Sequence, residues 1–463
     1  MRCGAYYPFS PMDNKPFVYR YTFLEVLMNN FKHLKNVLFN TIKILNDSRA
    51  LFVENQKTDF IRHRKLPFDA VLKSVICFEG GAMNDELLKL SDYSVNTPTA
   101  SAMIQARNKI KVDAFKALFD RFNEKTGKRK LHKGYRLLAI DGCEVPIDNT
   151  VYDKETTLIR HGTNPYSAFH LNPVYDLLEC TFDDLIIQGE AMNDERKAFC
   201  ELVDRYKGAG AIFIADRGYE SYNGFEHVVH SGNKYLIRVK DIESKSSITK
   251  SLGPFPDNDE FDVDVCRTLT IRQTNEIKKN PQKYKFCPSN LHFDYMDKMH
   301  PFYEFQCRVV RFRITEDSYE TVITNLDREE FTVEELKHLY NLRWGIETSF
   351  RLVKYAVDMN AFHSKKRKLI KQEIYARLLL YNFCQRMIQG IKIPKKKKNK
   401  YGYQINFTES CHIIRTFLKK KKGGADPPVE YLIAKYILPI RPGRKEPRYS
   451  SAKKAVCFNY RYN

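Results

Sequence analysis

The hydrophobic and polar positions of this 463-residue chain follow two different periods. Between about residues 20 and 130, apolar residues recur at helical spacing, as in 68–78 and in the longer run 101–127. From about Tyr135, short apolar runs of strand length take over. They are YRLLAIDG (135–142), HLNPVYDLLE (170–179), TFDDLIIQG (181–189), AIFIAD (211–216) and KYLIRVK (234–240). Helical segments lie between the later runs, so the pattern predicts a mixed α/β sheet covered by helices.

A different pattern occupies residues 243–330. Runs rich in Thr, Val and aromatic residues alternate polar and apolar positions at 267–273, 303–315 and 318–326. Turn segments that contain Pro and Asn separate these runs. We therefore expect an antiparallel β insertion within the α/β core.

The segment that starts at Phe331 has the sequence of a helix N-terminus. Thr332 can cap the free N–H groups and Glu335 can reach back to it. Phe331 can pack on Leu336 as a hydrophobic staple. We expect one helix from here to about Val357. On a helical wheel, its core-facing stripe consists of Leu339, Leu342, Ile346, Phe350, Val353 and Val357.

Four polar-tipped residues of this helix fall within a strip of about 60° beside the apolar stripe. They are Tyr340, Arg343, Glu347 and Lys354. An ordinary surface helix places its charges on the opposite side, whereas a carboxylate, two cations and a phenol at the edge suit a metal-bound phosphodiester. The simpler interpretation is an i,i+4 ion pair between Arg343 and Glu347, which contributes about 0.2–0.5 kcal/mol.

Two further carboxylates follow buried strands. Asp141 ends the run LLAI and Asp216 ends the run AIFIA. Sites in α/β sheets form near the carboxyl ends of strands, and metal-assisted phosphoryl transfer needs hard oxygen ligands. Together with Glu347, these two aspartates supply such a set. Each Asp can instead be a turn or capping residue, and Asp141-Gly142 is a common turn pair.

The net charge of +21 is concentrated in one part of the chain. Residues 360–463 hold 26 Lys or Arg and 5 Asp or Glu, whereas the preceding residues hold 51 of each sign. A basic region of this strength attracts polyanions such as DNA, and a solvated tail that aids solubility is the alternative. Arg107, Lys109 and Lys111 are further candidates for DNA contact, or else they form a solvated helix face.

Several classes of protein fit the chain poorly. Its apolar stretches are shorter than the roughly 20 residues that span a bilayer, and its first residues lack the apolar segment of a secretory signal. The 11 cysteines are scattered and form no CxxC pair, which predicts reduced thiols in a cytoplasm rather than a zinc or disulfide framework. A glycosidase with two carboxylates does not explain the cations of the helix or the basic C-terminal part.

The motifs occur in the order of a known family. Asp141, then DRGY (216–219), then Tyr340-x2-Arg343-x3-Glu347-x6-Lys354 resemble bacterial insertion-sequence transposases of the DDE type that carry the Tyr-Arg-Glu-Lys signature. FIRHRKLPF (60–68) and TASAMIQARNKI (99–110) are similar to segments of that family's N-terminal region. The resemblance implies an α/β fold, α+β as a whole, with a ribonuclease-H-like mixed-sheet catalytic core. An antiparallel β-strand insertion and flanking helical N- and C-terminal regions complete it.

The resemblance also implies an activity, cut-and-paste DNA transposition. Asp141, Asp216 and Glu347 would hold two Mg²⁺ or Mn²⁺ ions, and cleavage would free a 3′-OH that becomes the next nucleophile. The implied partners are double-stranded DNA, as terminal inverted repeats and as target, and a second copy of the chain in a homodimer. The candidates for phosphate or DNA contact are Tyr340, Arg343, Lys354, Arg217 and Tyr219.

Members of that family can stack a flipped base on a tryptophan of the insertion. The single tryptophan here, Trp344, lies in the signature helix and not in the insertion. Tyr319 in the last insertion strand is the candidate substitute, or it packs on the sheet.

The expected regions are 1–130, helical and DNA-binding; 131–242, first part of the core; 243–330, insertion; 331–369, glutamate helix; and 370–463, basic and helical. The alternative functions are a catalytically silent or domesticated relative that binds DNA sequence-specifically, and a DNA-binding regulator with structural carboxylates.

Overall fold

The computed structural model of the chain has two compact units. One unit, residues 129–144 and 170–347, is a mixed sheet with covering helices, and we call it the sheet unit. The other, up to Lys128 with 145–169 and from Thr348 onward, is mainly helical, and we call it the helical unit. The structure describes residues 18–62, 64–159, 164–208, 210–242, 244, 247–316, 318–393, 401–419 and 427–441. Within these ranges, no helix is long and apolar enough to span a membrane.

The strands that were expected from the short apolar runs are present. They are β1 (Arg136–Ile140), β4 (Tyr166–Asp176), β5 (Thr181–Gly189), β6 (Ala211–Ala215) and β7 (Lys234–Val239). Strand β1 pairs antiparallel with β4 and parallel with β6, which pairs parallel with β7. Strand β5 also pairs with β4, as do two short strands that the pattern did not predict, β2 (Cys143–Pro146) and β3 (Thr157–Leu158). This mixed sheet confirms the predicted fold class.

The insertion extends the same sheet. Its last strand pairs antiparallel with β7, and the two longest strands form an antiparallel ladder with it in the order β11-β10-β8. The exception to the expected antiparallel pattern is the short β9, which pairs parallel with β8. The elements are a 3₁₀ turn (Ile248–Ser251), β8 (Phe261–Thr270), α8 (Asn275–Lys279), β9 (Tyr284–Phe286), β10 (Phe302–Thr315) and β11 (Ser318–Thr324).

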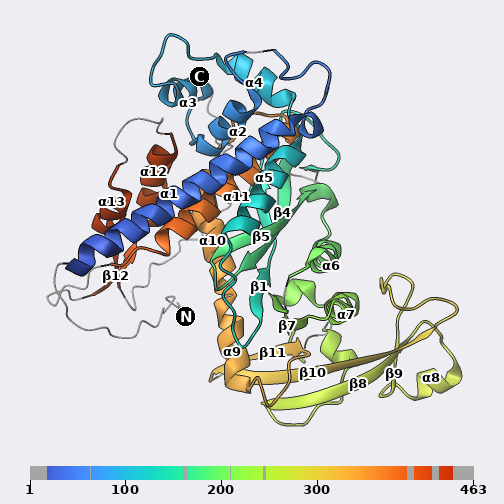
Figure 1. Cartoon of the computed structure of the whole chain (residues 1–463). Coiled ribbons are helices and arrows are strands. Elements are labelled where there is room, and N and C mark those ends of the chain that lie inside the picture. Colours follow the sequence, from blue (N-terminus) through green and yellow to red (C-terminus); the bar gives the residue numbers. More distant parts are fainter. Residues whose placement is uncertain are drawn as a thin grey trace. The chain divides into compact units, whose positions relative to one another are not determined.

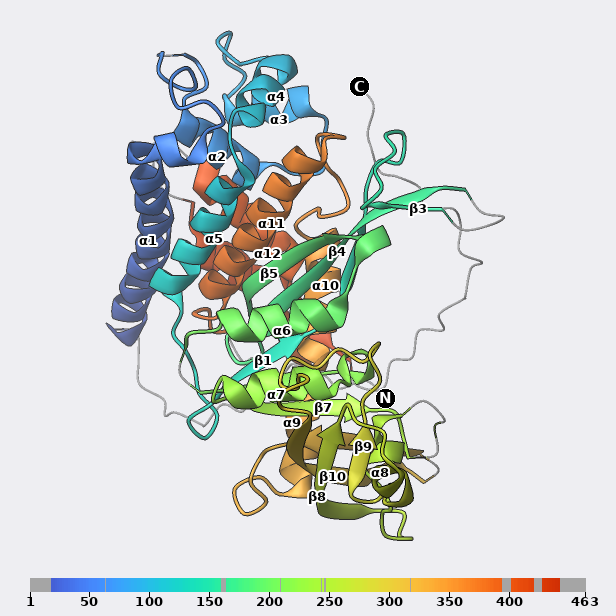
Figure 2. The ribbon, with the colours of Figure 1, turned by 90° about the vertical axis from the view of Figure 1, so that its right-hand side faces the viewer.

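Both faces of β1 and β6 are covered, which explains why residues 137–140 and 211–215 are apolar at every position. Helices α6 (Glu195–Arg205) and α7 (Tyr222–His230) pack with Leu138, Ile140 and Phe213 on one face. Helix α9 (Val333–Leu342) packs with Leu137, Ile212 and Ile214 on the other. Figures 1 and 2 show α6 and α7 side by side along the sheet. The alternation of adjacent residues between two hydrophobic clusters follows from the period of two of a strand.

The helical unit surrounds one buried helix, α11 (Arg367–Ile388), which contacts α1, α2, α4, α5 and α12 (Figure 2). Helices from both ends of the sequence therefore share one core. The remaining elements of this unit are α1 (Val18–Asp47), a 3₁₀ turn (Arg49–Phe52), α2 (Phe68–Cys77), α3 (Met83–Leu90), α4 (Ala100–Asn108), α5 (Val112–Thr126), β12 (Gly402–Ile405), α12 (Phe407–Lys419), α13 (Val429–Lys435) and β13 (Ile437–Ile440).

Two expectations for this unit are wrong. The run 101–127 is not one helix but two, because Ile110 leaves the helical path to form a bridge with Val53. Arg107 is not a DNA contact or a solvated side chain, since it is fully buried. Its guanidinium lies 2.8 Å from Glu373 and donates to the Leu369 carbonyl oxygen at 2.7 Å.

The two neighbouring lysines are also engaged. Lys109 lies 3.7 Å from Asp59, and Lys111 donates to the Leu51 carbonyl oxygen at 3.4 Å. The predicted basic C-terminal part is described only partially. Its run 394–400 and its last residues, 442–463, lie outside the described residues.

Candidate active site

Asp141 and Asp216 each follow directly after a buried strand, β1 and β6. Strands β1 and β6 are parallel neighbours with Ala139 opposite Ile214, so the residues that follow both strands emerge at the same edge of the sheet. One oxygen of each aspartate holds its own loop. Asp141 Oδ1 accepts from the Gly142 N–H at 2.9 Å, and Asp216 Oδ1 accepts from the Gly218 N–H at 2.8 Å. The turn interpretation is therefore correct for part of each side chain and does not exclude a second role.

The helix that carries Glu347 differs from the single helix that was expected. Helix α9 ends at Leu342 and α10 (Trp344–Tyr355) begins directly after Arg343. At the junction the Arg343 N–H bonds to the Tyr340 oxygen at 3.1 Å, and the Ile346 N–H bonds to the Arg343 oxygen at 3.0 Å. These i→i−3 bonds tighten the backbone, although Arg343 keeps helical angles. Glu347 therefore still lies one turn beyond Arg343.

Arg343 joins two of the three predicted carboxylates. Its Nη2 lies 2.9 Å from Glu347 Oε1 and its Nη1 lies 3.5 Å from Asp141 Oδ2. The i,i+4 ion pair thus exists, but the contact with Asp141 connects the helix junction to the end of β1. Its side chain is only 5% exposed, whereas Glu347 is 39% exposed. A guanidinium with two carboxylate neighbours and little solvent is held firmly in place.

The Asp141 carboxyl group is buried near other acidic side chains, and these surroundings change its pKa. Burial raises the pKa of Asp141, and the nearby Asp216 and Glu347 carboxylates raise it further. Arg343 opposes the increase only in part, so the pKa of Asp141 rises to about 7. Three carboxylates that repel one another at a strand edge have the charge and the hard oxygen atoms that suit a divalent cation. In the part of the chain that the structure describes, no three acidic, His or Cys side chains already converge as ligands.

The other predicted contact residues lie in different surroundings. Tyr340 is buried, and its ring centroid lies 5.5 Å from the Arg343 guanidinium. Tyr219 is also buried and packs on Phe199, whereas Arg217 is exposed. Lys354 is half-buried on α10, within the helical unit.

Tyr319, the candidate for base stacking, is held by its neighbours on the insertion. The Arg311 guanidinium lies 4.2 Å from its ring centroid. Its hydroxyl donates to Asp259 Oδ2 at 3.0 Å and accepts from Arg313 at 2.8 Å. Arg311 therefore covers one face of the ring.

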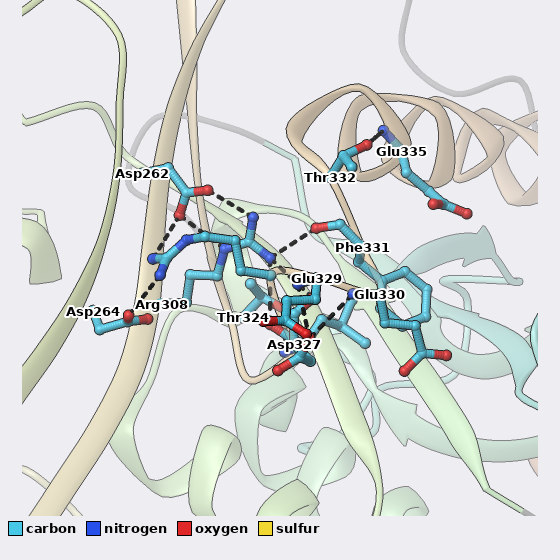
Figure 3. A network of polar contacts seen from close by, with 12 residues as sticks. Asp262, Asp264, Arg308, Thr324, Asp327, Glu329, Glu330, Phe331, Thr332 and Glu335 are labelled. Carbon is cyan, nitrogen blue, oxygen red and sulfur yellow. Dashed lines mark hydrogen bonds and ion pairs between the residues drawn. The ribbon is translucent and has the colours of Figure 1, made fainter.

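The start of α9 is fixed by the buried Arg308 of β10 (Figure 3). Arg308 pairs with both oxygens of Asp262 at 2.8 and 2.7 Å and donates to the Phe331 carbonyl oxygen at 2.9 Å. Thr332 accepts from the Glu335 N–H at 3.4 Å, which confirms the predicted cap. Glu335 does not reach back to complete the capping box, because its carboxylate pairs with His132 and Lys133.

The structure adds a fourth carboxylate that the sequence argument missed. Glu195, the first residue of α6, lies between the loops that follow Asp141 and Asp216. It accepts a hydrogen bond from His170 at 2.9 Å, and Glu190 contacts the other ring nitrogen of His170 at the same distance. The available signal was the pair of glycines, Gly142 and Gly218, that follow the two aspartates, because they leave room for a nearby side chain.

The chain is similar in sequence to known proteins. A family model described as "Transposase DDE domain" matches residues 132–383. The chain is 24% identical over 425 residues to the transposase InsG of insertion sequence element IS4 from Escherichia coli (strain K12), which covers 86% of this chain and 87% of that protein. It is 22% identical over 253 residues to the transposase of IS231F from Bacillus thuringiensis subsp. israelensis, covering 50% of this chain and 53% of that one.

One solved structure is also similar. The cryo-EM structure of the piggyBac transposase synaptic complex with hairpin DNA aligns with 85% of this chain and 80% of that chain. The sequence identity is 9% and the TM-score is 0.43.

Proposed function

The chain belongs to the transposase DDE domain family and is an insertion-sequence transposase, and we propose that Asp141, Asp216 and Glu347 form its catalytic centre. The observation that carries this proposal is that one cation, Arg343, lies 2.9 Å from Glu347 and 3.5 Å from Asp141, while Asp141 and Asp216 follow neighbouring parallel strands. Burial, and then the Asp216 and Glu347 carboxylates, raise the pKa of Asp141 to about 7 although Arg343 lowers it. A structural ion pair alone does not require an excess of negative charge. A site for divalent cations does, because the bound cations compensate it.

We assign two roles to the residues of this centre. Asp141, Asp216 and Glu347 would hold two Mg²⁺ or Mn²⁺ ions, which when bound polarise the scissile phosphate and activate the attacking water. Arg343 presents a planar guanidinium at the same edge and can exchange its carboxylate contacts for two phosphate oxygens. The buried ring of Tyr340 contacts the Arg343 guanidinium and helps to hold it in place. Hydrolysis of a phosphodiester at the element end frees a 3′-OH. Attack of that oxygen on a target phosphodiester forms a new P–O bond and breaks the target P–O3′ bond, whose oxygen leaves as a 3′-OH.

The proposed substrate is double-stranded DNA with the terminal inverted repeats of the element. The test is nicking of a plasmid that carries these repeats, with Mg²⁺ or Mn²⁺ and with EDTA. Glu347→Gln keeps the size of the side chain but removes a cation ligand, so we expect cleavage to fall by more than about 100-fold. Glu334→Gln makes the same change at an 80%-exposed position of α9 and is the matched control. Equal cleavage in EDTA, or full activity of Glu347→Gln, contradicts the assignment.

The basic C-terminal part is proposed to bind DNA along its backbone. Lys397 and Lys398 lie outside the described residues, so the argument rests on charge alone. Replacing both by Ala should weaken binding and reduce the slope of log K against log salt by about 1.8, because each phosphate contact contributes about 0.9. Fluorescence anisotropy with labelled end DNA measures this slope, and an unchanged slope returns the run to a solvated tail.

We propose a homodimer that holds two element ends. Sedimentation of the protein with end DNA tests this assembly. The alternative of a catalytically silent relative is less favoured, because the sequence keeps an acidic residue at all three proposed positions, Asp141, Asp216 and Glu347.

A further inference from the structure

Glu195 reaches toward both strand-end loops at the same time. A β-carbon built on Gly142 would lie 2.1 Å from Glu195 Oε1, which places this oxygen directly beside the residue after Asp141. A β-carbon built on Gly218 would lie 3.4 Å from Glu195 Oε2 and 3.1 Å from Asp216 Oδ1. The second oxygen of Glu195 and the carboxylate of Asp216 therefore face the same small space. The side chain is 34% exposed, so this space is accessible to a ligand.

The Glu195 carboxylate is held in this orientation by His170. The His170 ring is 10% exposed and lies between Glu195 Oε1 and Glu190 Oε2, each at 2.9 Å from a ring nitrogen. Because Oε1 accepts this bond, Oε2 remains directed to the Gly218 loop. Arg196 fixes that loop from the same helix by donating to the Gly218 carbonyl oxygen at 3.2 Å.

A second observation concerns Tyr219, the residue that follows Gly218. The Tyr219 hydroxyl is buried, and among the residues that the structure describes it has no hydrogen-bond partner. The charges that act most strongly on it are Glu195, then Asp141, then Asp216. A buried hydroxyl without a hydrogen-bond partner is costly unless a ligand completes its environment. An ion pair that only ties α6 to β4 accounts for the His170 contact but not for these features.

We propose that Glu195 is a fourth carboxylate of the catalytic centre, which binds a divalent cation together with Asp216, and that His170 is its positioning residue. This inference rests on the proposed function, because it assumes a cation at the strand edge. It also gives the two glycines a reason: any larger residue at position 142 would displace the Glu195 carboxylate. Residues that orient a metal ligand typically change metal affinity by about 10–100-fold when they are replaced.

The test is calorimetric titration of the full chain with Mn²⁺ in the absence of DNA. Glu195→Gln keeps the size and the acceptor for His170, so we expect the Mn²⁺ affinity to fall by about 10-fold or more while the melting temperature without metal is unchanged. Glu201→Gln, on the same helix and 47% exposed, removes the same charge away from the site and should bind Mn²⁺ like the wild type. Asp216→Asn tests the underlying centre.

Two outcomes separate the claims. If Asp216→Asn loses affinity and Glu195→Gln does not, Glu195 is not a ligand and the proposed catalytic centre stands. If Asp216→Asn binds Mn²⁺ like the wild type, the centre itself is wrong. Gly142→Ala provides a second route, since its methyl group displaces Glu195 without changing any charge. It should lower the affinity as Glu195→Gln does, and the double variant should lose nothing further; wild-type affinity in Gly142→Ala contradicts the proposal.

Discussion

Arg308 connects the insertion to the start of α9, and its replacement by Met should destabilise the sheet unit. Methionine keeps the aliphatic part of the side chain but removes the guanidinium. The change breaks the paired contacts with Asp262 at 2.8 and 2.7 Å and leaves the Phe331 carbonyl oxygen without its donor at 2.9 Å (Figure 3). Contacts to the Leu326 and Asp327 carbonyl oxygens at 3.3 Å are also lost.

The magnitude follows from burial. Arg308 is 4% exposed and Asp262 20% exposed, and breaking a buried ion pair costs about 3–5 kcal/mol. Because Asp262 keeps a second partner, Arg328 at 3.1 Å, the lower limit of about 3 kcal/mol applies. At about 2–4 °C per kcal/mol for a unit of this size, the melting temperature should fall by about 6–12 °C.

Scanning calorimetry of the purified variants measures this decrease. Arg313→Met is the matched control, because Arg313 lies on the same strand, is 46% exposed and pairs with Asp259 at 3.7 Å. An exposed pair contributes at most about 1 kcal/mol, so this control should melt within about 4 °C of the wild type. If Arg308→Met has the same melting temperature as Arg313→Met, the contacts of Arg308 do not stabilise the start of α9.

Two further predictions concern other ionic contacts. Burial lowers the pKa of His227, but hydrogen bonds to Asp204 and Asp294 at 2.9 Å outweigh it, so the pKa is raised in the folded state. The stabilisation by His227 is therefore complete below about pH 6.5 and is lost as pH rises through the pKa of the folded state. The difference in melting temperature between wild type and His227→Gln should shrink from pH 6 to 9. A constant difference contradicts this prediction. Arg107→Met removes the partner at 2.8 Å from the buried Glu373 carboxylate, which keeps only His363 at 3.0 Å and Arg377 at 3.9 Å, and should cost about 3 kcal/mol in urea unfolding. Loss of DNA affinity in a fully folded, equally stable variant would instead indicate a DNA contact.

Local rules predicted much of the proposed catalytic centre from the sequence. An apolar strand followed by Asp is a short-range signal, and the parallel pairing of β1 and β6 then brings Asp141 and Asp216 to one edge. The Arg343–Glu347 contact follows from a spacing of four residues along a helix. The Thr332 cap is equally local. Apart from the β1–β6 pairing, each of these features depends on residues that are close in the sequence.

Tertiary packing decided what these rules left open. Arg107 has the sequence context of a surface residue, yet it is buried because Glu373, far away in the sequence, supplies the opposite charge. Glu335 fits a capping box, but His132 and Lys133 compete for its carboxylate. The sequence presents Glu195 as an ordinary acidic residue in the first turn of α6. Its contact with His170 of β4 and the space left by the two glycines place it beside the aspartates. Periodicity describes which face of an element is buried, whereas the partner of a charged side chain is set by segments that meet only in the folded chain.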